Sequence, residues 1–384
     1  MHENERELSC FGIRTRSSFI SGSFHVIDGL PPDIMHDLLE GVVPFEMALL
    51  LKHFVSKGYF TVDELNRTLA SWKYGPLDKA NKPVPITSTV GETIKQNTGR
   101  TWCLLRLFLL MVSSKVPVGD KYWQLFLELK EIVELVFAPH LAVGHVLMLQ
   151  VKVHDHLQLF HELFPGKLLK PKQNFMLHYA KAMLVYGPLR NCWCMRFEAK
   201  HYYFSRLMRV VNNFKHACKT LAERHQMNLA YLLANNSMFA EHEMSVSATV
   251  NVNINFLSES VVEILRRSNI CMSKPLHQCR FVKVNSIVYH CNMYVVIDFV
   301  NDTPLFGQIQ VIYVQNLKPF FLVKVCTSEY DTHLSGYVMN ATDEIAVYSI
   351  DQLLDYYLLS GYIVGLRRVV VLKNFVYNQS QFDW

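Results

Sequence analysis

The stretch Pro31-Pro-Asp-Ile-Met-His-Asp-Leu-Leu-Glu-Gly-Val42 contains both a helix start and a group of charged side chains. Two prolines break the preceding chain, and Asp33 occupies the N-cap position of the helix that follows. Asp33 and His36 are three residues apart, so they share one face of the first turn, with Glu40 one turn further on. Apolar residues continue at helical spacing to Phe54, and Pro44 is expected to kink or divide this helix.

A second stretch, Gly187-Pro-Leu-Arg-Asn-Cys-Trp-Cys-Met-Arg-Phe-Glu-Ala-Lys-His201, contains one acid among several cations. That acid, Glu198, either forms an ion pair with a neighbouring cation or holds a divalent metal ion next to bound phosphates. Spacing alone leaves both interpretations open. Cys192 and Cys194 have no second pair at zinc-finger spacing, so the sequence does not predict a structural zinc site.

Positive charge is concentrated in one part of the chain. The formal net charge is +5, yet the 167–224 segment alone has twelve Lys and Arg against two acids, Glu198 and Glu223. Aromatic residues are interleaved with these cations. Such a segment is typical of nucleic-acid binding, because cations release counterions from phosphates and rings stack on bases. The alternative is a solvated helix surface around an aromatic core.

Composition and motifs exclude several classes of protein. The 384 residues are 50% hydrophobic and 18% charged, which suits two or three folded domains rather than a disordered chain. No apolar run reaches the length of a membrane span, and the first residues do not resemble a secretory signal. Nine scattered cysteines are typical of reduced thiols in the cytosol or nucleus. Phosphate-loop, dinucleotide, HExxH and GxSxG motifs are absent.

Hydrophobic periodicity predicts an α+β protein with the two types of structure in separate parts of the chain. We expect a mainly helical region over residues 1–240, a linker over 241–278 and a small antiparallel, barrel-like β-module over 279–384. A β-like stretch is expected at 23–27, and Thr61 and Glu64 form a capping box. Further helices are predicted at 99–115, 119–137, 141–163, 172–186, 196–213, 216–235 and 259–267, and strands at 279–288, 292–300, 305–315, 319–327, 334–340, 344–349 and 366–377.

Three histidines fall in the predicted 141–163 helix. His154 and His156 point about 200° apart, and only His154 and His161 share a face. We therefore interpret these histidines as residues of the polar face rather than as metal ligands.

The two motifs together resemble transposase-derived proteins of the CACTA (En/Spm-like) DDE lineage, over roughly residues 10–235. That family has an RNase H-like catalytic core interrupted by a mainly helical insertion. Asp33-Ile-Met-His36 matches its Asp-x-x-His signature, and Phe197-Glu198 matches the late Phe-Glu that supplies the third acid. The resemblance implies that the helices between about 38 and 185 are the insertion. It also implies Asp33, His36 and Glu198 as catalytic positions and Glu198 as a metal ligand.

The chain departs from this family in its first residues. The family's two catalytic aspartates precede the Asp-x-x-His signature, whereas only Asp28 lies upstream here. Two-metal phosphoryl transfer needs several converging carboxylates, so we expect an incomplete, inactive site without the Mg²⁺ of the family. We interpret the chain as the carboxy-terminal portion of a transposase with the core sheet largely missing. The helix bearing Glu198 should then expose an apolar patch of Phe197, Phe204, Leu207 and Val211.

Three functions follow as hypotheses. The first is a transposon-derived, nuclear protein that binds DNA through the basic segment without strand transfer; a cytoplasmic location is the alternative. The second is a protein-interaction scaffold that binds partners through the helices or the β-module. The third is a transposase or nuclease completed by upstream sequence. The residues expected to bind DNA are Lys170, Lys172, Arg190, Arg196, Lys200, Arg206 and Arg209.

Overall fold

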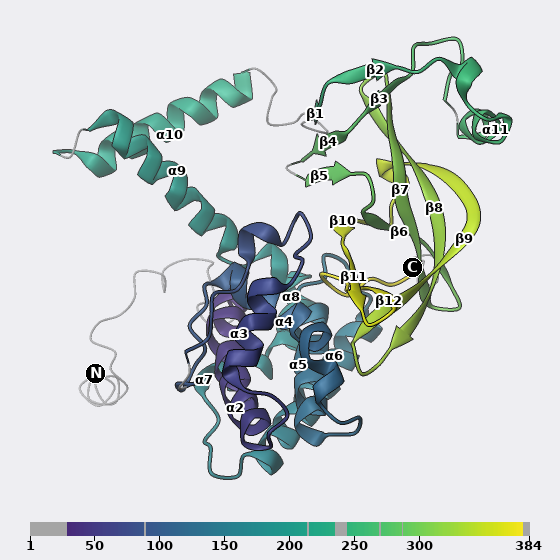
Figure 1. The fold of residues 1–384 in the computed structure, drawn as a ribbon. Coiled ribbons are helices and arrows are strands. Elements are labelled where there is room, and N and C mark those ends of the chain that lie inside the picture. Colours follow the sequence, from purple (N-terminus) through teal and green to yellow (C-terminus); the bar gives the residue numbers. More distant parts are fainter. Residues whose placement is uncertain are drawn as a thin grey trace.

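The protein consists of a helical body, a projecting helical arm and a long curved β-sheet (Figure 1). The computed structural model describes residues 29–87, 90–212, 215–234, 244–268, 270–285 and 287–378, without the side chain of Arg196. These residues contain ten α-helices and two antiparallel sheets, which confirms the α+β class. The β-like stretch predicted at 23–27 lies outside the described residues. None of the described helices has the length and apolar character needed to cross a membrane.

The helical body follows the predicted periodicity closely. Its capping box at Thr61 forms as expected, with both reciprocal bonds between Thr61 and Glu64. The predicted 172–186 helix is instead two helices, because the chain turns tightly at Leu177 and His178. The elements are η2 (Met35–Val42), α2 (Val43–Ser56), α3 (Val62–Ser71), η3 (Lys79–Asn81), α4 (Thr98–Val112), η4 (Ser113–Lys115), α5 (Lys121–Val136), α6 (Val143–Leu163), α7 (Pro171–Met176), α8 (Tyr179–Tyr186) and η5 (Leu189–Asn191).

The first helix of the body is a π-helix, and Pro44 explains where it ends. Proline has no amide hydrogen, so the usual bond from position 44 to the carbonyl of Glu40 cannot form. The chain over Met35–Val42 takes the wider π form, and regular α-helix begins at Val43. Pro44 therefore divides the helix as predicted. The π turns also carry His36 and Glu40, and such irregular turns are frequent at functional sites.

The arm consists of α9 (Met195–Val211) and α10 (Ala217–Ala234), and it extends away from the body (Figure 1). Among its described side chains none is buried. The apolar patch predicted on α9 is present: Phe197 is 68% exposed, and Phe204, Leu207 and Val211 are only partly covered. The contact that holds the two helices together includes the edge-to-face rings of Phe204 and His225.

The β-module is antiparallel throughout. Long strands β7, β8 and β9 form its centre, and the larger sheet has the order β10-β6-β7-β8-β9-β12-β11, while β1, β4 and β5 form a smaller sheet. Helix α11 (Glu259–Arg267) packs Leu265 against this module. The strands are β1 (Met244–Val246), β2 (Thr249–Asn251), β3 (His277–Cys279), β4 (Phe281–Val284), β5 (Ile287–His290), β6 (Tyr294–Val300), β7 (Thr303–Gln315), β8 (Lys318–Asp331), β9 (Gly336–Ser349), β10 (Asp355–Leu359), β11 (Gly361–Val364) and β12 (Arg367–Val370). Short 3-10 turns η6 (Ile254–Phe256) and η7 (Ile350–Gln352) connect parts of this region.

The predicted barrel-like closure is wrong. The edge strands β10 and β11 are consecutive in the chain, yet no ladder pairs them among the described strands. Instead they lie at opposite edges of the sheet: β10 pairs with β6 at one edge, and β11 pairs with β12 at the other. The sheet curves strongly, with register shifts in the β6–β7, β7–β8 and β8–β9 ladders, but stays open. Strand spacing predicts antiparallel pairing but not whether the two edges meet.

The β-sheet and the helical body share one hydrophobic core. Leu334, Tyr362, Val369 and Val371 of the sheet region belong to the same buried cluster as the helices. The β8–β9 turn reaches the helices, where the Trp123 indole donates to the carbonyl of His333 at 3.1 Å. The two parts of the chain are therefore packed together through buried, specific contacts.

Candidate functional site

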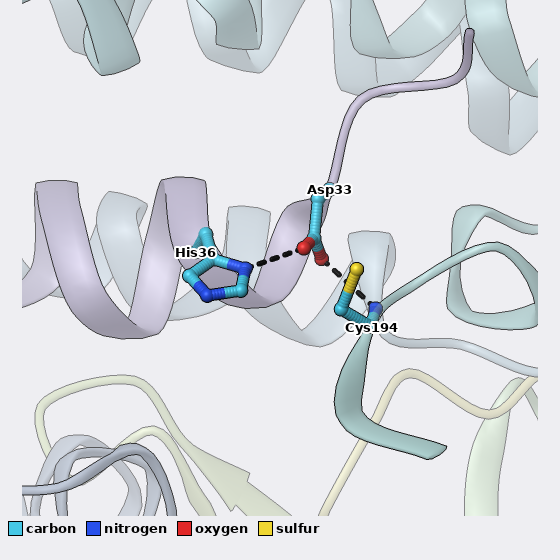
Figure 2. A group of neighbouring side chains, drawn as sticks. All are labelled: Asp33, His36 and Cys194. Carbon is cyan, nitrogen blue, oxygen red and sulfur yellow. Dashed lines mark hydrogen bonds and ion pairs between the residues drawn. The ribbon is translucent and has the colours of Figure 1, made fainter. Parts of the chain in front are cut away.

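Asp33, His36 and Cys194 meet where the body joins the arm (Figure 2). Asp33 precedes the helix, His36 is on the π-helix η2, and Cys194 is the N-cap residue of α9. The Asp33 Oδ2 and His36 Nδ1 atoms are 2.5 Å apart, and the Cys194 amide donates to Asp33 Oδ1 at 3.1 Å. Asp33 Oδ1 also accepts from the Met35 amide at 3.2 Å. The carboxylate of Asp33 is thus held from both segments.

The structure brings Glu198 to the same histidine. Glu198 Oε1 lies 3.4 Å from His36 Nε2, and Glu40 Oε2 lies 3.7 Å from the same nitrogen. The three residues implied by the resemblance, Asp33, His36 and Glu198, therefore form one cluster although up to 165 positions separate them. Three carboxylates surround one imidazole, counting Glu40. The sequence placed Glu40 on the face of Asp33 and His36 but did not include it in the predicted site.

Hydrogen bonding shifts the protonation equilibria of this cluster. The bond with Asp33 raises the pKa of His36, and the nearby Glu40 and Glu198 carboxylates act in the same direction. Partial burial acts to raise the pKa of Asp33, but hydrogen bonds from Cys194 and His36 outweigh it and hold that pKa below its usual value. The contact with Asp33, with burial in addition, raises the pKa of the Cys194 thiol to about 11. The cluster thus favours a charged Asp33–His36 pair beside a neutral thiol.

Asp37 forms a second, deeper acidic position that the sequence analysis did not select. It is buried, and the Tyr179 hydroxyl donates to its Oδ2 at 3.4 Å. Burial raises the pKa of Asp37 to about 6, although the Lys172 ammonium opposes this shift. Lys172 itself donates to the main-chain carbonyl of His36 at 2.7 Å. The sequence spacing could not indicate that Asp37 is buried, because Tyr179 and Lys172, which contact this region, come from helices far away in the sequence.

A cavity of about 490 Å³ opens beside Asp33 and Asp37. Its walls combine apolar side chains from the segment before η2, from α7 and from α8 with the polar side chains of His178 and Lys181. They include Leu30, Phe175, His178, Lys181 and Val185. Asp33 lines this cavity, and the cluster of Asp33, His36 and Cys194 beside it offers a carboxylate, an imidazole and a thiol. These donor types suit metal binding, and acid–base exchange at the His36 imidazole is also within their chemistry.

The seven predicted DNA-binding residues do not form one surface. Lys200, Arg206 and Arg209 are on α9 in the arm, where Arg206 and Arg209 are three residues apart and share a face. Arg190 instead lies on η5 of the body and packs against the sheet, with its guanidinium carbon 4.9 Å from the centre of the Tyr357 ring on β10. Lys172 is bound to His36, while Lys170 is exposed near Phe45. The side chain of Arg196 lies outside the described structure.

The arm carries seven of the twelve Lys and Arg residues of the basic 167–224 segment. Between Met195 and Ala234 the chain has seven Lys and Arg against two Glu. Exposed rings accompany them: Tyr202 is 67% exposed, and the Arg206 guanidinium carbon lies 5.9 Å from its ring centre. Lys200 lies 4.6 Å from the ring centre of Tyr203. Cations and rings are therefore presented together on a projecting element.

The prediction for the histidines of α6 is wrong for His156. His154 and His161 are exposed as expected, but His156 is completely buried, with Nε2 3.0 Å from Glu46 Oε2. Glu46 is itself buried and accepts from the Gln173 side chain at 2.7 Å. The sequence could not show this, because Glu46 and Gln173 come from helices more than a hundred positions apart. His156 supports the packing of α2, α6 and α7 away from the Asp33 cluster.

Comparison with known proteins finds no relative. No family model, curated protein or solved structure matches the chain.

Proposed function

We propose that the protein is a transposon-derived DNA-binding protein that contacts the phosphate backbone through its α9–α10 arm. The observation that carries the proposal is the arm itself, a projecting element whose described side chains are all at least partly exposed and whose charge is strongly basic. Phosphate binding by such an element gains free energy from counterion release and needs no preformed pocket. Exposed Tyr202 and Phe197 add rings for contact with sugars or unpaired bases.

The proposal also includes an origin and a location. Asp33, His36 and Glu198 lie close together, as the resemblance to CACTA transposases implies for residues of the catalytic site of an RNase H-like core. In this interpretation the helices between about 38 and 185 descend from the insertion, and the exposed apolar face of α9 is where the core sheet would pack. A DNA-binding protein of this descent would act in the nucleus.

Neutralising the arm should weaken DNA binding strongly. We expect the triple variant Lys200→Ala, Arg206→Ala, Arg209→Ala to bind a labelled duplex about 10²-fold more weakly at low salt. The slope of log affinity against log salt concentration should fall by about 3, because each cation releases roughly one counterion. Fluorescence anisotropy of the full chain over a salt series measures both quantities.

The matched control removes three exposed cations outside the arm, Lys274, Arg280 and Lys318. This variant should keep the affinity and the salt slope. No binding by the unaltered protein at low salt would reject the proposal and favour a protein-interaction scaffold. Equal losses in the two triple variants would show that net charge, rather than the arm, attracts the DNA.

Metal-dependent cleavage of DNA is a second candidate, favoured by the three carboxylates around His36. Carboxylates that converge on one place are the ligands with which such enzymes hold Mg²⁺ or Mn²⁺. If this function is present, nicking of supercoiled plasmid in Mn²⁺ should fall at least ~10²-fold in Glu198→Gln. The Glu223→Gln variant, which changes the other acid of the arm, should nick at the original rate. Nicking that is equal in both variants would come from a contaminant.

A further inference from the structure

We propose that Asp33, His36 and Cys194 form a Zn²⁺-binding site that fastens the base of the arm to the helical body. One potential ligand atom from each residue lies within 4.8 Å of the other two. The three residues come from both sides of the junction between body and arm (Figure 2). The inference does not depend on DNA binding, since a fastened arm can serve any partner.

The donor set fits zinc better than the hard cations. It offers one carboxylate oxygen, one imidazole nitrogen and one thiolate sulfur, which are the three ligand types of protein zinc sites. Mg²⁺ and Ca²⁺ prefer oxygen ligands throughout, so the Cys194 sulfur selects against them. Three protein ligands leave a fourth position for water, which is the arrangement of catalytic zinc sites.

The distances require only small movements. Zinc bonds of about 2.0–2.3 Å in a tetrahedron place ligand atoms about 3–4 Å apart. Atoms within 4.8 Å of one another reach that spacing by rotation of side chains. The 2.5 Å contact between Asp33 Oδ2 and His36 Nδ1 shares a proton, which the metal ion would displace as it separates the two atoms slightly.

The surroundings supply the outer contacts that zinc ligands usually have. With His36 Nδ1 facing the metal, Nε2 faces Glu198 at 3.4 Å and Glu40 at 3.7 Å. A carboxylate on the far nitrogen fixes the tautomer and orientation of a ligating histidine. Asp33 is oriented in turn by the amides of Met35 and Cys194. The excess of carboxylates also gives the place a negative field that a divalent cation would balance.

A bound ion would have a mechanical effect. Asp33 and Cys194 are 161 positions apart, and Cys194 is the residue immediately before α9. Without a metal ion, the hydrogen bond from the Cys194 amide to Asp33 already connects the base of the arm to the body, but more weakly than metal–ligand bonds would. Zinc would add metal–ligand bonds to this hydrogen bond and so restrict how the arm is directed from the body.

Zinc titration of the metal-free full chain tests the site. Isothermal titration calorimetry with ZnCl₂ should show one more equivalent bound by the unaltered protein than by Cys194→Ser or His36→Ala. Cys192→Ser, two positions away and also partly exposed, should bind as the unaltered protein does. Circular dichroism of each variant shows whether the helices are retained, so that loss of binding is separated from loss of folding.

Cobalt provides a readout specific to the thiolate. Co²⁺ bound at the site should give a sulfur-to-cobalt charge-transfer absorption that is absent in Cys194→Ser, present in Cys192→Ser and unaffected by excess Mg²⁺. Identical zinc stoichiometry in the unaltered protein and in both ligand variants would overturn the proposal, as would no zinc binding at all. Neither outcome changes the salt-dependent DNA affinity, so the two proposals fail separately.

Discussion

Replacing Asp78 by asparagine is expected to lower the free energy of unfolding by about 3–5 kcal/mol, because it leaves a buried guanidinium without its counterion. Asp78 accepts from Arg106 Nη1 at 2.9 Å and from the Tyr362 hydroxyl at 2.7 Å. Arg106 is only 4% exposed. Burial acts to raise the pKa of Asp78, but the Arg106 charge outweighs it and keeps the carboxyl ionised with a pKa below its usual value. The pair thus depends on both charges.

A double-mutant cycle with chemical denaturation separates the sources of this effect. If the cost comes from unpaired Arg106, adding Arg106→Met to Asp78→Asn should restore part of the lost stability. Glu223→Gln, which breaks the exposed pair with Lys219, serves as the control and should change stability by less than about 1 kcal/mol. A loss in Asp78→Asn no larger than in this control would contradict the prediction.

The contrast between these two ion pairs shows which parts of the fold were readable in the sequence. The i,i+4 pair of Lys219 and Glu223, the capping box at Thr61 and the helix over Glu259–Arg267 depend on neighbours within a few positions. Hydrophobic period and cap residues specify such features locally. The Asp78–Tyr362 bond spans 284 positions, and nothing in the spacing indicates it.

The candidate site shows the same limit. The Asp-x-x-His spacing placed Asp33, His36 and Glu40 on one side of a helix, and the resemblance added Glu198. Cys194 was missed, because its neighbours Asp33 and His36 lie about 160 positions away in the sequence and are not a second cysteine pair. The open sheet was also missed, since the meeting of two edges depends on accumulated twist and register shifts that no single strand encodes.

Removing the buried carboxyl of Asp355 is expected to stabilise the protein above neutral pH. Asp355 begins β10 and is 3% exposed; its Oδ1 accepts from the Tyr357 amide at 3.0 Å, while Oδ2 finds no donor among the described residues. Burial raises its pKa from 3.8 to about 7, even though the Arg190 and Lys373 charges oppose this shift. The native protein therefore keeps a proton here that the unfolded chain has already lost between about pH 4 and pH 7.

The sign of the pH dependence follows from this difference in bound protons. Where the native state binds more protons, the free energy of unfolding falls as the pH rises. Asp355 therefore lowers the free energy of unfolding progressively from about pH 4, and this loss of stability is complete above about pH 7. An asparagine in its place would not titrate, and the amide oxygen can keep the bond to Tyr357. At about 1.4 kcal/mol per pKa unit, Asp355→Asn should be more stable than the unaltered protein by about 2–4 kcal/mol at about pH 8. The two proteins should converge near pH 4.

Denaturant unfolding at several pH values between about 4 and 8 measures this difference directly. Because both proteins contain the same other titrating groups, subtraction isolates the Asp355 contribution. The exposed carboxylate of Asp343 on β9 offers a matched control, and Asp343→Asn should leave stability nearly unchanged at every pH. A constant offset between Asp355→Asn and the unaltered protein would show that packing, rather than the buried charge, sets the stability of this strand.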